Sequence, residues 1–130
     1  MSISRTAQFR PVEHAAGKVM DGELVVINFH SGLYYSSVGI GTAIWQLMEA
    51  GQPLGAIAAT ISRDTGTALA TVESDATAFL DQLLSAGLIE PAESNASATD
   101  VTYGGAYATP TLTAFDDLEQ SFALDPPLQA

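Results

Sequence analysis

The sequence feature that most constrains the fold is a change of hydrophobic period near Gly41. Before it, residues 24–29 and 33–38 are rich in β-branched and aromatic side chains, which is typical of strands. After it, Ile40, Ile44 and Leu47 recur at the spacing of one helix face. Because the chain passes once from a strand pattern to a helix pattern, it predicts an α+β fold with helices on one face of a small sheet.

The strand-like part of the sequence predicts a three-stranded antiparallel meander. Short strand candidates at residues 9–12 and 18–20 precede the runs at 24–29 and 33–38. The pairs Asp21-Gly22 and Ser31-Gly32 predict the turns, because glycine tolerates the positive φ that tight hairpins require.

Three helices are predicted after the sheet. The first ends at Gly51, and the second begins with Pro53 in its first turn and ends near Gly66. The third has Thr71 as its expected cap and ends at Gly87, and its apolar stripe consists of Val72, Ala76, Phe79, Leu80 and Leu83. Leu88 and Ile89 follow as a short extended segment. The order of elements is that of a winged helix-turn-helix domain, whose commonest use is DNA binding.

The distribution of charge argues against that use. The net charge is −11, and residues 65–130 contain ten acidic and no basic side chains. Nucleic-acid binding depends on Lys and Arg displacing counterions, and residues 71–86 have neither. Anionic membrane surfaces are disfavoured for the same reason. A neutral or basic protein or peptide is the better match.

The sequence contains no recognisable catalytic or metal-binding constellation. There is no cysteine, and His14 and His30 stand in loop or strand-end positions without a neighbouring ligand in the sequence, so we expect them to be solvated. We therefore expect no enzyme activity, no cofactor and no metal. No apolar run is long enough to cross a membrane, and the N-terminus lacks the apolar region of a signal peptide, so a cytoplasmic protein is expected.

Residues 32–51 and 75–89 together resemble the PqqD-like family. The first stretch has a glycine, an aromatic strand, a turn of small residues and Ile44-Trp45 in the opening helix, and the second ends in Leu-Ile. The resemblance covers residues 7–91. One departure is Ser37-Val38, where many relatives have Leu-Asn or Leu-Asp after the aromatic strand.

The resemblance implies a RiPP recognition element, a non-catalytic domain that holds the leader of a ribosomally made precursor peptide for a separate modifying enzyme. The leader would add a strand to the exposed third strand of the meander and seat side chains against the third helix. The implied peptide-binding residues of the strand are Leu33, Tyr34, Tyr35, Ser36, Ser37 and Val38. Those of the exposed side of the helix are Val72, Asp75, Ala76, Phe79 and Leu83.

Residues 92–106 are rich in Ala, Ser, Thr and Gly and predict a flexible linker, so the chain divides into a winged-helix domain at 1–91, this linker and an acidic tail at 107–130. The tail has a short helix predicted from Phe115 to Phe122. Tyr107, Pro110 and Leu112 have the spacing Tyr-x-x-Pro-x-Leu, which is similar to the leader motif that PqqD-like proteins of lasso-peptide pathways recognise. This similarity gives the hypothesis that the tail mimics a leader and docks in the groove of its own or a neighbouring domain.

Two other interpretations stay open at the level of sequence. The same edge strand, or a swapped tail, would serve a homodimer, which makes a non-catalytic dimerising adaptor the main alternative. An acidic winged-helix regulator is the second.

Overall fold

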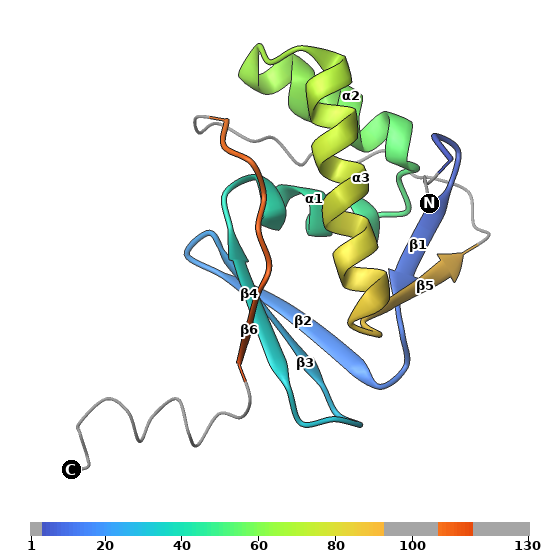
Figure 1. Cartoon of the computed structure of the whole chain (residues 1–130), viewed down its shortest axis with the longest axis vertical. Coiled ribbons are helices and arrows are strands. Elements are labelled where there is room, and N and C mark those ends of the chain that lie inside the picture. The colour runs from blue at the N-terminus through green and yellow to red at the C-terminus, as the bar shows by residue number, and fades with distance from the viewer. Residues whose placement is uncertain (1–3, 93–106, 116–130) are drawn as a thin grey trace.

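The computed structural model describes residues 4–92 and 107–115, and these residues form the predicted α+β fold (Figure 1). Four strands come first: β1 (Gln8–Pro11), β2 (Ala15–Met20), β3 (Glu23–Asn28) and β4 (Tyr34–Val38). Three helices follow: α1 (Ile40–Glu49), α2 (Leu54–Thr65) and α3 (Leu69–Ser85). The last described elements are β5 (Ile89–Ala92) and β6 (Thr113–Phe115).

The main sheet has four strands in the order β2-β3-β4-β6, all antiparallel, so the prediction of a three-stranded sheet is wrong by one strand. The three predicted strands form the meander as expected. The additional strand, β6, comes from the tail and pairs with β4, with Ser36 opposite Thr113 and Tyr34 opposite Phe115. A helix starting at Phe115 is therefore wrong at its first residue, and its remainder lies outside the described residues.

A second, two-stranded sheet joins the two ends of residues 8–92. β1 pairs with β5, which places Pro11 opposite Ile89 and Gln8 opposite Ala92. The extended segment predicted after α3 is thus a strand, and it includes the first residue of the expected linker. Residues 93–106 lie outside the described part, so the linker stays a prediction.

The helices form where the periodicity predicts them, with one different start. α2 ends at Thr65, and Gly66 adopts the left-handed conformation expected of a C-terminal glycine. α3 begins at Leu69 after Ala68, and no side chain caps it, so the prediction that Thr71 caps the helix is wrong. Thr71 instead lies inside the first turn of the helix. The helix can begin without a side-chain cap because packing of its apolar face supplies most of its stability.

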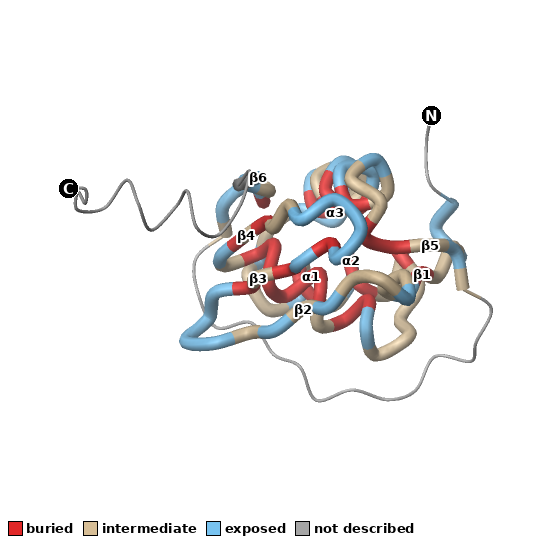
Figure 2. Tube along the Cα trace, turned by 90° about the horizontal axis from the view of Figure 1, so that it is seen from below, coloured by how far each residue is buried: buried red, intermediate tan, exposed pale blue. Residues whose placement is uncertain are grey.

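The core lies between the helices and the inner face of the sheet. Figure 2 shows buried residues gathered along α1, β3 and β4. Trp45, Ile44 and Met48 of α1 are completely inaccessible to solvent. Within the described residues, no helix is both long enough and apolar enough to cross a membrane.

Gly17 on β2 allows the sheet to approach the indole of Trp45. A Cβ atom built on Gly17 would come within 3.0 Å of three atoms of that ring, which is closer than Cβ atoms pack. Trp45 is fully buried, so its ring cannot turn away into solvent. The absence of a side chain at position 17 is therefore a packing requirement.

We predict that Gly17→Ala lowers the free energy of unfolding by about 2 kcal/mol, the usual range for overpacking a core, and so lowers Tm by roughly 10 °C. Thermal denaturation followed by circular dichroism measures the change. Trp45→Phe in the same background should relieve part of the clash, giving a double variant more stable than the sum of the single effects. Strict additivity would contradict the assigned contact.

Candidate functional site

The candidate site is built around β4, which uses both of its edges. One edge pairs with β3, where Tyr35 lies opposite Val26, and the other pairs with β6, where Tyr35 lies opposite Ala114. Side chains alternate across the strand, so Tyr35 and Ser37 are buried, Tyr34 and Ser36 are half-buried and Val38 is exposed. Tyr34 is therefore the more accessible of the two adjacent tyrosines. Leu33 directly precedes the strand and packs against the core.

Two buried polar side chains hold β4 in position. Asn28 accepts hydrogen bonds from the backbone N–H groups of His30 and Ser31, at 2.9 and 3.2 Å, and donates to the carbonyl of Ala86 at 3.4 Å. It therefore ties the turn before β4 to the end of α3. At the other end of β4, the Thr42 hydroxyl lies 3.1 Å from the Ser37 carbonyl, to which it can donate.

The corner between β4 and α1 depends on small residues. A Cβ atom on Gly41 would collide with the side chain of Ser37 and lie 3.0 Å from the ring of Phe79 on α3. Gly41 thus leaves space for the Ser37 hydroxyl, which donates a 2.6 Å hydrogen bond to the carbonyl of Thr111. This role of Gly41 was not predicted from the sequence, because no local pattern signals it.

The tail residues 107–115 lie against β4 and α3, the two elements implied by the resemblance (Figures 1 and 2). The Tyr107 hydroxyl donates a 2.6 Å hydrogen bond to a carboxylate oxygen of Asp75 on α3. Pro110 is buried, and Leu112 packs half-buried against the core. We call the surface formed by β4 and the Asp75 side of α3 the β4–α3 groove.

The helix residues implied for this groove differ in accessibility. With the tail in place, Asp75 is half-buried, whereas Val72, Ala76, Phe79 and Leu83 are each at most 1% exposed and belong to the core. At these four residues, the side of α3 that was expected to be exposed is therefore covered in this arrangement, and their contact with a leader stays a prediction. Their spacing along the helix is that of an apolar stripe that faces a core, and in this structure the stripe packs into the core.

The surroundings of Tyr107 favour its neutral form. Burial, and then the hydrogen bond and negative charge of Asp75, raise the pKa of Tyr107 well above its ordinary value. The neutral hydroxyl can donate to the carboxylate, whereas a phenolate would be repelled by it.

The two histidines lie together, although no pattern in the sequence indicates that they pair. The rings of His14 and His30 stack with centroids 3.7 Å apart and planes 4° from parallel. The backbone explains the contact, because the N–H of Phe29 bonds to the carbonyl of His14 at 2.8 Å. No group of three or more potential metal ligands occurs among the described residues.

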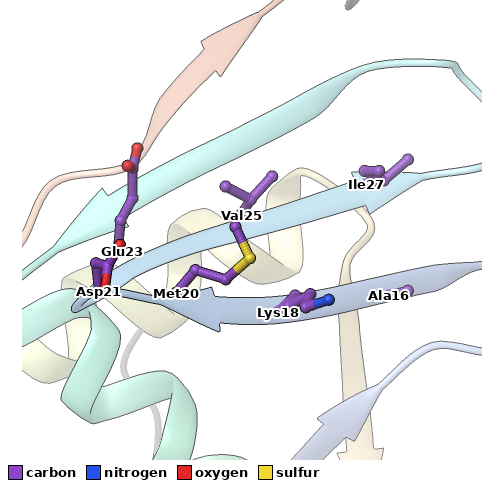
Figure 3. Close-up of a pocket in the computed structure, with 8 residues that line it drawn as sticks. Ala16, Lys18, Met20, Asp21, Glu23, Val25 and Ile27 are labelled. Atoms are coloured by element: carbon purple, nitrogen blue, oxygen red, sulfur yellow. The ribbon is translucent and has the colours of Figure 1, made fainter.

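A second hollow, of about 630 Å³, lies on the outer face of β2 and β3 (Figure 3). Met20, Val25 and Ile27 line it together with the stem of Lys18. Val25 and Ile27 alternate along β3 with core residues, so this hollow opens on the face of the sheet opposite the helices. It is separate from the β4–α3 groove.

The family model of the Coenzyme PQQ synthesis protein D (PqqD) matches residues 23–89, a stretch that includes β4 and α3. The chain belongs to the PqqD family. Among solved structures, this PqqD-family chain is similar to the one described as "TbiB1 in Complex with the TbiA(beta) Leader Peptide". The two are 27% identical with a TM-score of 0.60, and the match covers 62% of this chain and 94% of the other. A search of the curated proteins found no match.

The docked state of Tyr107 predicts a pH dependence. A group whose pKa is raised on docking contributes stability below its ordinary pKa, and this contribution is lost as the pH rises through the raised value. We therefore expect the tail to dock at neutral pH and to lose this contribution above about pH 10, the ordinary pKa of tyrosine. The ring signals of Tyr107, assigned by NMR with Tyr107→Phe, should titrate later than those of an unperturbed tyrosine.

Asp75→Asn should move the pKa of Tyr107 down, because the amide removes the negative charge. Asp81→Asn is the matched control, since Asp81 lies exposed on the same helix and its substitution removes the same charge. An ordinary titration of Tyr107 in the unaltered protein would contradict the docked geometry.

Proposed function

We propose that this PqqD-family chain binds the leader segment of a ribosomally made precursor peptide in the β4–α3 groove and holds it for a separate modifying enzyme. The observation that carries the proposal is the outer edge of β4, to which a separate extended segment adds as a strand in register. Main-chain pairing of this kind is how an extended peptide joins a sheet edge. The likeness to TbiB1, whose structure is described as a complex with a leader peptide, supports the same class of ligand.

The residues proposed to contact the leader follow from the same geometry. Tyr34 and Ser36 stand on the less buried face of β4, while the Ser37 hydroxyl reaches a backbone carbonyl of the added segment. Asp75 provides an acceptor for a donor side chain of the leader. The buried residues of α3, including Phe79, would support the floor of the groove and contact the leader only where it seats an apolar side chain.

The domain is proposed to act by binding and to leave the chemistry to its partner enzyme. Leader recognition needs an extended strand, a polar anchor and apolar contacts, and the groove supplies all three. A cytoplasmic location and a lasso-peptide type of precursor belong to the same proposal. The motif Tyr107-x-x-Pro110-x-Leu112, which lies on this groove, supports the lasso-peptide type.

A first experiment titrates the fluorescein-labelled leader of any short precursor reading frame found beside this gene into the ¹⁵N-labelled full chain. We expect saturable binding, with amide shifts concentrated in β4 and around Asp75 and small shifts in α2. A leader of scrambled sequence is the control. Absence of saturable binding, or shifts confined to the outer hollow of β2 and β3, would refute the proposed site.

A second measurement tests strand addition directly. N-methylation of the leader backbone should weaken binding about 3- to 10-fold at every second residue of the paired segment, because each such change removes a hydrogen bond worth about 1 kcal/mol. Methylation at the intervening residues is the built-in control and should change the affinity little. A uniform response along the peptide would argue against strand pairing.

The dimerising adaptor makes a different prediction from the same edge. If β4 paired with β4 of a second copy, sedimentation would show dimers at rising protein concentration, and added leader would leave them intact. We expect instead that the leader binds without such dimers.

A further inference from the structure

We propose that residues 107–115 are an internal ligand of the β4–α3 groove, and that an external peptide gains full access only when this segment leaves. The inference deepens the proposed function, on which it rests, by assigning a regulator to the same site. We call residues 107–115 the docked segment.

The docked segment is bound along its whole length rather than at one point. Its first residue, Tyr107, donates to Asp75 on α3. Its middle is fixed by the hydrogen bond from Ser37 to the carbonyl of Thr111, and its end pairs with β4 as β6. The two walls of the groove are therefore both occupied.

The burial pattern of the docked segment follows its sequence motif. Tyr107 and Leu112 are half-buried and Pro110 is buried, whereas Ala108 and Thr109 between them are exposed. Thr111, between Pro110 and Leu112, is exposed as well. The three spaced residues are thus the ones that face the domain. A segment that crossed the surface without specific recognition would have no reason to bury these three of residues 107–114 and leave the other five exposed.

Occupation by the docked segment and strand addition by an external leader exclude each other. A strand has two hydrogen-bonding edges, and β3 occupies one edge of β4 throughout its length. The other edge is taken by β6 opposite Tyr34, Tyr35 and Ser36. An incoming peptide must displace β6 before it can pair with the same backbone groups.

The covalent connection makes even weak docking effective. Residues 93–106 join the docked segment covalently to β5. A binding segment attached through a short connection has an effective concentration on the order of 1 mM. If the segment alone bound with a Kd of about 10–100 µM, it would raise the apparent Kd of an external peptide roughly 10- to 100-fold.

The test uses the full chain and a fluorescein-labelled synthetic peptide with the sequence of residues 105–118 as the probe. Leu112→Asp places a charge on a side chain that packs against the core, and it should release the docked segment. Thr109→Asp is the matched control, because it adds the same charge at an exposed position of the segment. By fluorescence anisotropy, we expect Leu112→Asp to bind the probe about 10- to 100-fold more tightly than the unaltered chain, and Thr109→Asp to match the unaltered chain.

A second arm avoids any effect of the substitution on folding. A specific protease site is inserted in residues 93–106, and the folded chain is cut and then diluted to a low micromolar concentration. Cleavage should raise the probe affinity to the level of Leu112→Asp. Equal probe affinity of the unaltered chain, the cut chain and Leu112→Asp would overturn internal docking, as would no binding to any of them.

A titration with the neighbouring-gene leader distinguishes a failure of this inference from a failure of the proposed function. If Leu112→Asp binds the probe but not the leader, internal docking stands and leader binding fails. If the leader binds the unaltered chain and Leu112→Asp with equal affinity, leader binding stands and the internal competitor is overturned.

Discussion

The outer edge of β4 is the constraint on which the rest of the structure depends. Backbone N–H and C=O groups need partners, and an unpaired strand edge is a template for any extended segment that can reach it. The sheet order β2-β3-β4-β6 satisfies the edge of β4 within the described chain itself. Everything around β4 keeps that edge straight and in place: Asn28 ties its beginning to α3, and Thr42 ties its end to α1.

The corner after β4 couples the edge to the core. Ser37 is buried, yet its hydroxyl reaches the carbonyl of Thr111, because Gly41 has no side chain and leaves room beside it. A buried hydroxyl without a partner is costly, so this position is satisfied best when an extended chain lies in the groove. The occupied groove is in this sense part of the folded structure as well as a binding site.

The sequence predicted the parts of the fold that local patterns determine. Helical periodicity located α1, α2 and α3, and strand-like runs located β3 and β4, because burial of one face imposes its period on the residues of that element. The start of α3 was placed three residues late, since capping preferences are weak compared with the burial of residues such as Val72. The resemblance named both walls of the groove but not which side chains remain accessible.

Pairings between distant segments could not be read from the sequence. β1 joins β5 across the whole domain, β6 joins β4, and the rings of His14 and His30 stack because β2 and β3 bring their ends together. Nothing in the local sequence of these segments indicates which segment each one pairs with. The motif at residues 107–112 was the exception, because its spacing could be compared with that of a known leader motif. Even so, the comparison indicated only a resemblance to this kind of ligand.

The contacts of the groove differ in what they contribute to selectivity. Asp75 is half-buried, so a ligand without a hydroxyl donor would leave its carboxylate in contact with water, and the loss would be modest. Pro110 is buried, and a polar side chain there would lose its hydration without gaining a partner. Backbone pairing with β4 accepts almost any sequence. We therefore expect the apolar positions to contribute most to discrimination between peptides, and Asp75 to orient the docked segment and fix its register relative to β4.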